Sequence, residues 1–574
     1  MFSKNQHLHE NIEELDLGED KTAWLALYKA RRPGEEAGRI NVDPPSPQGS
    51  LTKDIPPLES FLVTLARCLL AARPGGWYWF GAAVFAVLVT MATFVPYLAQ
   101  DAASPEDHVF SWLLTAIPDQ ASYLMWMDQH AQGVFLPQDR MTTEPLSPFL
   151  PNPVWMLLGW LSRPIGLIKA YHVGRAVFGL AYILLLAALF RAHFQAQRTA
   201  FLALVMASLG SGLAFIQALG LMVETADWMP ELWSFSSLLY FPHFAAALAL
   251  LALALLLIAR GRGWLAGVTL AILVFVHPYT ALPVGVAIAL RAIVGRAQGI
   301  PWTDDLRALV VFAASMASMG LAIFLTPGMR TWAERNLMPS PPFWQYLLGL
   351  GLVLPLAFLA FVRYLCRREW DRARILWVAW ILVTFILAYS SPLLPCERRV
   401  VEGVHIAFVA MATTLLGPVL ERLKPAAAAA VIAIAGLLVA PTNALLVHRE
   451  ATAPNSGQIP KDWPDLWTTV RALPGERTVF SDARRSVFLA GLGGGTVYLG
   501  HQELTPDFER KLRTVHEFYA RQASWPERLA TIRTTGCRYL VLTPEDVLAL
   551  GPDGPPASAL VARGQTWALF GPLW

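Results

Sequence analysis

The chain has 574 residues, of which 55% are hydrophobic and 15% are charged, and its formal net charge is +3. Soluble domains carry about 25% charged residues, so the composition excludes an ordinary soluble protein. Runs of about 20 apolar residues recur, each long enough to cross a hydrocarbon core of about 30 Å. The basic residues stand in short loops between these runs, which excludes nucleic acid as the reason for the positive charge. The sequence predicts a polytopic α-helical protein in a lipid bilayer.

Residues 1–75 precede the first apolar run and are expected to be cytoplasmic and largely disordered. Residues 1–55 are charged and then rich in proline, a composition that cannot bury a core. A short helix is an option at Lys21–Arg31, and Leu58–Ala72 is typical of an amphipathic segment at the membrane surface. No cleavable signal peptide is visible, so we expect the first apolar run to stay as a span.

The four cysteines are scattered along the chain without CxxC or Cys/His spacing. This pattern indicates neither a disulfide framework nor a zinc site. Nothing in the sequence requires a metal or another cofactor, although a divalent metal stays an open alternative.

We predict about eleven transmembrane helices in a domain over residues 76–448. Two of them are short and are interrupted by His277-Pro278, which predicts a tight hairpin at the outer face. Val154–Ile168, fenced by prolines, is short for a span and is expected to be half-inserted. The expected spans are Gly76–Leu98, Tyr171–Phe190, Phe201–Gly220, Leu238–Ile258, Trp264–Val276, Pro278–Ile293, Ala308–Leu325, Trp344–Val362, Ile375–Tyr389, Val404–Leu420 and Ala426–Val447.

The distribution of lysine and arginine predicts the orientation of these spans. One set of loops holds Arg191, Arg198, Arg260, Arg262, Arg291, Arg296, Arg307, Arg363, Arg367, Arg368, Arg372, Arg374, Arg422 and Lys424. The positive-inside rule makes that side cytoplasmic. The N-terminus then lies inside and the C-terminus outside, in a multi-pass protein of the inner (plasma) membrane.

The loop over residues 100–153, between the first two spans, then lies outside. It carries Pro118-Asp119-Gln120-Ala121-Ser122-Tyr123, in which the tyrosine follows the aspartate at i+4, on the same face of a helix. We expect His108–His130 to form an amphipathic helix parallel to the membrane. Its lipid-facing residues would be Trp112, Leu113, Tyr123, Leu124 and Trp126, and its water-facing residues Asp119, Asp128 and Gln129.

From about Ala451 the composition becomes that of a soluble protein, and we predict a small extracytoplasmic α/β domain over residues 449–574. Strand and helix signals alternate in it. The expected strands are Arg477–Ser481, Thr496–Leu499, Tyr539–Thr543 and Thr566–Phe570, and the expected helices Pro506–Arg521 and Trp525–Thr535. The glycine-rich residues 491–495 lack the Lys-Ser/Thr of a P-loop and lead into a strand, which predicts a turn.

Unusual polar residues gather on the outer side once the spans are oriented. Ionisable residues at membrane depth are unfavourable and are therefore candidates for function. Arg398-Arg399 departs most clearly from the positive-inside pattern, and a guanidinium pair suits a phosphate group. The alternative is a salt bridge from either arginine to Glu397 or Glu402. The other candidates are Asp119, Tyr123, Glu144, His172, Arg175, His243, His277, Tyr279 and Glu402.

Two of these candidates have a plainer interpretation. A histidine at the end of a buried helix is more often a hydrogen-bonded structural residue, which is the alternative for His243 and His277. Glu224, Asp227 and Glu231 have the composition of a solvated acidic loop.

The chain resembles the GT-C glycosyltransferase superfamily, which includes protein O-mannosyltransferases and the aminoarabinose transferases of lipid A. The resemblance covers about residues 76–574 and is to a bacterial branch of the superfamily. Gln120 replaces the second acidic residue of the family's Asp-Glu-x-x-Tyr element. The further motifs are Thr143-Glu144-Pro145, Tyr171-His172-x-x-Arg175, Ser236-Ser237-Leu238-Leu239-Tyr240-x-Pro242-His243, His277-Pro278-Tyr279, Arg398-Arg399-x-x-Glu402-Gly403, Gly500-His501 and Thr505-Pro506-Asp507-Phe508.

The resemblance implies an inverting hexosyl or pentosyl transfer from a polyprenyl-phosphate-linked donor. The acceptor hydroxyl would belong to a glycan, a lipid or a protein at the outer face. Asp119 would act as general base, and Arg398, Arg399 and Arg175 would bind the donor phosphate. Orientation of the substrates would fall to Tyr123, Glu144, His172, His243, His277, Tyr279 and Glu402.

Two other classes of function stay open. A flippase or transporter for lipid-linked glycans predicts internal repeats and polar residues through the span interiors. A non-catalytic scaffold of glycan assembly would keep the fold without needing Asp119.

Overall fold

The computed structural model describes residues 76–574 except 222, 391–393, 395, 455–456 and 521–522. The described residues all belong to one unit, Ala66–Trp574. The expectations for the N-terminal tail, the helix Lys21–Arg31 and the surface segment Leu58–Ala72 concern residues outside this description.

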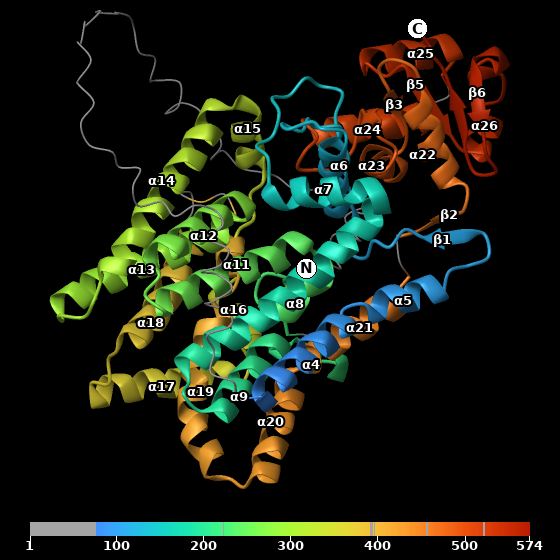
Figure 1. The fold of residues 1–574 in the computed structure, drawn as a ribbon. Helices are drawn as coiled ribbons and strands as arrows, with labels where there is room; N and C mark the ends of the chain where they lie inside the picture. The colour runs from blue at the N-terminus through green and yellow to red at the C-terminus, as the bar shows by residue number, and fades with distance from the viewer. Residues whose placement is uncertain (1–75, 222, 391–393, 395, 455–456, 521–522) are drawn as a thin grey trace, which may run out of the picture. The chain divides into compact units, whose positions relative to one another are not determined.

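Apolar helices account for most of the chain before residue 453 (Figure 1). The longer ones are α4 (Gly76–Ala92), α5 (Val95–Ala102), α8 (Leu167–His193), α9 (Gln197–Leu209), α11 (Pro242–Ala259), α12 (Gly263–Val276), α13 (Pro278–Ala297), α14 (Thr303–Leu325), α17 (Val353–Arg367), α18 (Arg372–Leu387), α19 (His405–Arg422), α20 (Pro425–Val439) and α21 (Pro441–Thr452). Five of these, α5, α11, α13, α20 and α21, have proline in the first two helical positions. Proline is favourable there because its fixed φ is helical and its missing N–H would have had no partner.

Six of the described helical segments are long and apolar enough to cross a membrane, or eight if each of two bent pairs is one span. The bent pairs are α16 (Phe343–Gly349) with α17, at 98°, and α20 with α21, at 54°. Each of the eleven expected spans overlaps a helix. However, α9, α12 and α18 have only 13, 14 and 16 residues, and at about 1.5 Å per residue they are shorter than a bilayer core. The chain is a multi-pass membrane protein, and the expected count of eleven spans is not confirmed.

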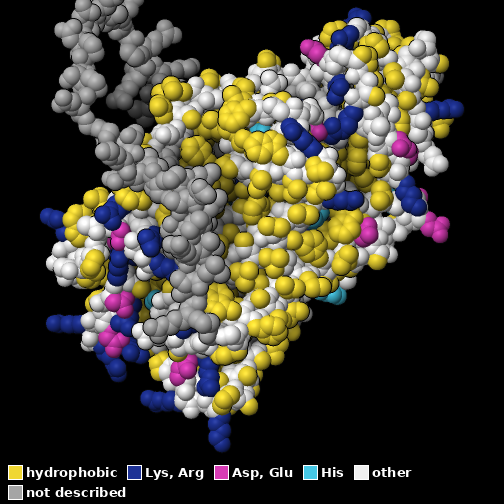
Figure 2. Space-filling view, in the orientation of Figure 1, with side chains coloured by type: hydrophobic (Ala, Val, Ile, Leu, Met, Phe, Trp, Pro, Cys, Tyr) yellow, Lys and Arg dark blue, Asp and Glu magenta, His cyan; other side chains and the backbone are white. Residues whose placement is uncertain are grey.

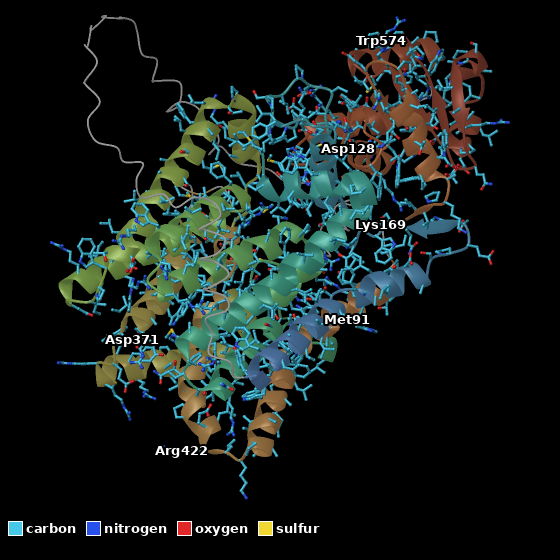
Figure 3. The ribbon with its side chains drawn as sticks, in the orientation of Figure 1. Met91, Asp128, Lys169, Asp371, Arg422 and Trp574 are labelled. Carbon is cyan, nitrogen blue, oxygen red and sulfur yellow. The ribbon has the colours of Figure 1, made fainter. Side chains whose placement is uncertain are left out.

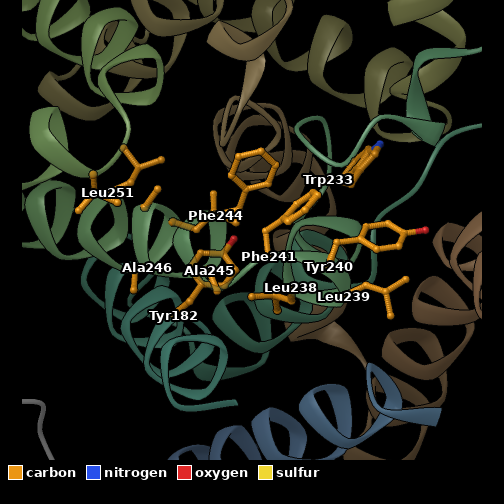
Figure 4. Packing of buried hydrophobic residues seen from close by; sticks show 14 of the residues in the cluster. Tyr182, Trp233, Leu238, Leu239, Tyr240, Phe241, Phe244, Ala245, Ala246 and Leu251 are labelled. Carbon is orange, nitrogen blue, oxygen red and sulfur yellow. The ribbon is translucent and has the colours of Figure 1, made fainter. Parts of the chain in front are cut away.

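The interior of the helical part is apolar with a few partnered polar groups. Tyr182, Leu238, Phe244 and Leu251 pack between α8, α10 (Ser234–Tyr240) and α11 (Figure 4). The hydroxyl of Tyr182 shares a hydrogen bond of 2.6 Å with the Ser234 hydroxyl, which in turn lies 2.6 Å from His405 Nε2. Such partners offset the loss of hydration that burial imposes on polar groups.

The surface of the helical part is also largely apolar, and Figure 2 shows hydrophobic side chains over much of the visible face. Large side chains such as Phe80, Met91 and Phe324 are 73%, 63% and 67% exposed. Exposed apolar surface of this extent is typical of a membrane-facing region. Figure 3 shows Asp371 and Arg422 at the end of the helices away from Asp128 and Trp574.

The expected amphipathic helix His108–His130 is only partly formed, and its two expected faces are wrong. Its start is the strand β1 (His108–Phe110), which pairs antiparallel with β2 (Gln458–Pro460). The helix α6 spans Ile117–Ala131. Leu113, Leu124 and Tyr123, expected to face lipid, are buried, and so are Asp128 and Gln129, expected to face water. The reason is tertiary packing: α7 (Pro153–Ile165) and α23 (Ala483–Gly491) both lie against α6.

The C-terminal part contains a five-stranded sheet in the order β4-β3-β5-β7-β6. The strands are β3 (Thr478–Phe480), β4 (Thr496–Val497), β5 (Tyr539–Leu542), β6 (Leu560–Arg563) and β7 (Ala568–Phe570). β3 is parallel to β4 and β5, whereas β7 is antiparallel to β5 and β6. The helices are α22 (Trp463–Ala472), α23, α24 (Phe508–Ala520), α25 (Trp525–Thr534) and α26 (Pro544–Leu550).

All four expected strands and both expected helices of this part are confirmed. The glycine-rich residues form the expected turn between α23 and β4, where Gly494 has φ +67°. Its extracytoplasmic placement and the boundary at residue 449 remain predictions.

Gly491, at the end of α23, sits directly against the helix α6. A Cβ added there would lie 2.8 Å from the Ala121 carbonyl oxygen and 2.9 Å from the Ala121 Cβ. We expect Gly491→Val to destabilise the fold by about 1–3 kcal/mol, since α23 and α6 would have to separate. The measurement is thermal unfolding in detergent. Gly320→Val, at a helical glycine with no atom within 4 Å of an added Cβ and no positive φ, is the matched control. A melting temperature for Gly491→Val as high as that of Gly320→Val would contradict the close packing.

Candidate functional site

A cavity of about 190 Å³ lies where the helical part meets the C-terminal part. Its walls come from α6, α7, the starts of α11 and α13, the ends of α12 and α14, the helix α15 (Pro327–Arg335), η4 (Glu397–Val401) and residues 501–504. Six of the predicted site residues line it: Asp119, Tyr123, His243, His277, Tyr279 and Arg399.

Asp119 stands in the first turn of α6 and faces the cavity, with 37% of its side chain exposed. The preceding Ala116 has φ +62°, a left-handed conformation that is unfavourable for alanine. This turn brings the chain into α6 so that the carboxylate lies at the positive end of the helix. Strain of this kind is often found at functional sites.

His501, from the C-terminal part, pairs with Asp119. Its Nε2 lies 3.2 Å from Asp119 Oδ1, and its Nδ1 accepts a hydrogen bond of 3.0 Å from the backbone N–H of Glu503. Because Nδ1 accepts, the neutral ring carries its hydrogen on Nε2 and donates it to Asp119. Burial lowers the pKa of His501, but the neighbouring carboxylate more than offsets this and holds it above the usual value.

The same contacts set the charge of Asp119. Burial raises the pKa of this carboxyl, but the hydrogen bond and charge of His501, with the charges of Arg399 and Arg398, bring it below its usual value. Asp119 is therefore ionised at neutral pH.

Sequence reasoning assigned no role to His501 or to Glu503, which also lines the cavity. Asp119 and His501 are 382 residues apart, so no local spacing connects them. The one available signal was the Gly500-His501 pair among the motifs of the resemblance.

The two adjacent arginines separate in the structure. Arg399 lines the cavity, and its buried Nε has no hydrogen-bond partner. Among the described residues, Arg399 forms no ion pair with an acidic side chain. Arg398 lies outside the cavity lining, where it pairs with Glu231 at 3.3 Å and not with Glu397 or Glu402. Arg399 thus brings a positive charge to the cavity that no direct ion pair among the described residues engages.

Aromatic side chains form the wall next to Asp119. Tyr123 stacks on Trp155, with ring centroids 4.6 Å apart and an angle of 12° between the planes. His243 lies against the same tyrosine, with 4.8 Å between centroids. A flat apolar wall of this kind suits the face of a sugar or another ring.

Glu402 does not line the cavity but contacts two residues beside it. Its Oε2 lies 2.8 Å from His277 Nδ1 and accepts a hydrogen bond of 2.5 Å from the Thr280 hydroxyl. The carboxylate is 1% exposed, so it acts on the cavity only through these neighbours.

Besides Arg398 and Glu402, three more predicted residues lie outside the cavity lining. Arg175 is fully buried and donates to His172 Nδ1 at 2.7 Å and to the carbonyl oxygens of Leu238 and Thr93. His172 Nε2 lies 2.9 Å from the Trp112 carbonyl oxygen. Glu144 pairs with Lys511 of α24 at 3.0 Å. These contacts tie α8 and the loop 100–153 to their neighbours, which is a structural role.

Within the ranges that the structure describes, no group of three or more His, Cys, Asp or Glu side chains is placed to hold a metal ion.

No family model matches the sequence, and no curated protein matches it either. Among solved structures, the chain is similar to the oligosaccharyltransferase of Archaeoglobus fulgidus with a tethered acceptor peptide, at a TM-score of 0.46 and 14% identity over 82% of this chain and 69% of that one. The AglB oligosaccharyltransferase of the same organism, in complex with an inhibitory peptide and a dolichol-phosphate, matches with a TM-score of 0.46 and 13% identity over 82% of this chain and 69% of that one. ArnT from Cupriavidus metallidurans, bound to undecaprenyl phosphate, matches with a TM-score of 0.47 and 15% identity over 86% of this chain and 98% of that one.

Proposed function

We propose that the chain transfers a sugar from a polyprenyl-phosphate-linked donor to an acceptor hydroxyl at the outer face of the membrane, with inversion at the anomeric carbon. One observation carries the proposal. A single cavity holds an ionised carboxylate, Asp119, and an arginine that has no acidic partner among the described residues, Arg399.

Asp119 is the general base. Its carboxylate takes the proton of the acceptor hydroxyl while the oxygen attacks the anomeric carbon from the face opposite the phosphate. The bond from the anomeric carbon to the phosphate oxygen then breaks, and its electron pair stays on that oxygen. Attack and departure on opposite faces give inversion.

Arg399 binds the donor phosphate. Its guanidinium stays charged at any physiological pH and offers paired donors that fit phosphate oxygens. As the bond to the sugar breaks, negative charge grows on the phosphate, and a fixed positive charge beside it lowers the energy of that state.

An apolar wall supports a lipid-linked donor over a nucleotide-linked one. Met319 and Ile323 of α14 and Met329 of α15 line the cavity. α14 also exposes Leu321, Phe324 and Leu325. These residues place apolar side chains of α14 both in the cavity and on its exposed side, which suits an isoprenoid chain linked to the phosphate.

The test uses membranes that contain the chain and a panel of polyprenyl-phosphate hexoses and pentoses, labelled separately in the sugar and in the phosphate. A transferase moves the sugar label to an acceptor and leaves labelled polyprenyl phosphate. A flippase moves the intact donor between leaflets without breaking it, and a scaffold does neither. Either of these last two results contradicts the proposal.

His501 sets the lower pH limit of the reaction. Because His501 helps to hold the pKa of Asp119 below its usual value, we expect His501→Ala to raise that pKa. Transfer needs the ionised carboxylate, so the acidic limb of the pH–rate profile moves to higher pH. His501→Gln keeps a side-chain N–H donor and should shift the limb less. The measurement is the transfer rate between about pH 4 and pH 8, roughly the range in which carboxyl and imidazole groups titrate. An acidic limb that is unchanged in both variants would show that His501 does not control the pKa of Asp119.

A further inference from the structure

His277 and Glu402 form a second carboxylate–imidazole pair at the cavity. His277 stands at the junction of α12 and α13, is 3% exposed and lines the cavity. Its Nδ1 lies 2.8 Å from Glu402 Oε2 and 2.6 Å from the Thr280 hydroxyl oxygen. The Thr280 hydroxyl donates its own hydrogen to Glu402. Both neighbours of Nδ1 are therefore acceptors toward the ring, and Nδ1 carries a hydrogen.

The other ring nitrogen of His277 is the one left for a ligand. Nε2 is buried and has no hydrogen-bond partner, and the ring is part of the cavity wall. Buried polar atoms in folded proteins are nearly always partnered, and the exceptions call for an explanation. A bound substrate group at Nε2 supplies one.

The charge of the Glu402 carboxylate affects whether His277 Nε2 can donate a hydrogen bond. A buried carboxylate is stable only beside a compensating positive charge or several donors. Among the described residues, the only basic side chain paired with Glu402 is His277. A ring that carries hydrogen on both nitrogens can neutralise Glu402 through Nδ1 and present an N–H at Nε2 to the cavity.

The other groups that contact the His277 ring do not take up the hydrogen at Nε2. His243 and Tyr279 lie against it, with ring centroids 6.1 Å and 5.9 Å away, and Phe244 covers another side. Tyr279 and Arg399 line the same cavity. None of these neighbours of the ring is a carboxylate that could accept the Nε2 proton. Asp119 and Glu503 line the same cavity, but neither forms an ion pair with His277 among the described residues. The group that receives the proton is then a phosphate held by Arg399.

We propose that His277 is the general acid of the reaction and that Glu402 positions it; this proposal rests on the transferase function above. As the bond between the anomeric carbon and the phosphate oxygen breaks, the Nε2 proton passes to that oxygen. The acceptor proton has gone to Asp119, so the products are the glycoside and a protonated lipid phosphate. His277 is left neutral, with its Nδ1–H still donated to the Glu402 carboxylate. The two residues return to their starting states by exchange with water.

The leaving atom tests this step. A donor with sulfur in place of the bridging oxygen gives a thiolate-like leaving group that needs no proton. With the oxygen donor, we expect His277→Ala to lower the transfer rate by about 10²-fold, the usual scale of general acid catalysis. With the sulfur donor, the same variant should be within a few-fold of wild type. Glu402→Gln should also lower the transfer rate more with the oxygen donor than with the sulfur donor, but by a smaller factor than His277→Ala does.

His172→Gln is the matched control, because His172 is a buried histidine outside the cavity. Any loss in this variant should be equal for the two donors. An equal loss for both donors in His277→Ala would overturn the general-acid role and leave a structural one. Transfer by the wild type from the oxygen donor, measured in the same experiment, reports separately on the proposed function.

Discussion

Asp119→Asn is expected to lower the rate of sugar transfer by about 10²–10⁴-fold, the range that a well-placed general base contributes. Asparagine has the shape of aspartate, and its carbonyl oxygen can still accept the hydrogen bond from His501 Nε2. The amide cannot take a proton from the acceptor hydroxyl. The loss should therefore appear in the rate of the chemical step, with expression, folding and donor binding close to those of the wild type.

Asp128→Asn is the control on the same helix. Asp128 is a buried carboxylate of α6, but it pairs with Arg140 at 2.7 Å and Arg471 at 2.9 Å and does not line the cavity. Its replacement should lower the melting temperature and change transfer per folded molecule by a few-fold at most. If Asp119→Asn transfers sugar as fast as the wild type, Asp119 is not the base.

Arg399→Ala should lower transfer by about 10²–10³-fold, the scale measured when one charge-stabilising donor is removed from a transition state. Arg399 forms no ion pair with an acidic side chain among the described residues, so its removal leaves no buried carboxylate unpaired. The variant should therefore fold normally but bind polyprenyl phosphate weakly. Transfer rates and polyprenyl phosphate binding in detergent measure the two effects.

Arg398→Ala is the matched control, and the two neighbours should behave differently. Arg398 forms an ion pair with Glu231, whose side chain is 2% exposed. Removal of Arg398 therefore leaves a buried carboxylate without its partner and should lower thermal stability. Its guanidinium is not part of the cavity, so phosphate binding per folded molecule should be nearly preserved. Equal loss of phosphate binding in the two variants would show that the arginines act together, as the sequence alone suggested.

Apolar run length and turn chemistry predict where the helices lie, and they do so well here. The break at His277-Pro278 ends α12 and starts α13, because proline cannot continue a helix but suits its first turn. In the C-terminal part, short β-branched runs between turns predict β3, β4, β5 and β7. The number of spans could not be predicted in this way. Composition identifies α9 and α18 as apolar, but whether such short helices cross a membrane depends on their neighbours.

Some residues of the candidate site could be predicted from the sequence, and others could not. Asp119 and Arg399 could be found because each is an unusual charge at a particular place in the chain. The roles of Arg175 and Glu144 could not be predicted, because their partners, Leu238 and Lys511, are brought to them only by folding. The faces of α6 were wrong for the same reason, since α23 covers a side that looked free to face water. His501 reaches Asp119 from the far end of the sequence.

The most direct test of the central claim is a single-turnover experiment with purified protein in lipid vesicles. Excess wild-type protein is loaded with a polyprenyl-phosphate sugar labelled in the phosphate, and the formation of polyprenyl phosphate is followed after addition of a membrane extract that supplies acceptors. We predict that the wild type releases polyprenyl phosphate and that Asp119→Asn binds the same amount of donor but releases polyprenyl phosphate about 10²–10⁴-fold more slowly. Equal release by the two proteins would contradict catalysis at this cavity, and no release by the wild type from any donor of the panel would contradict the transferase function itself.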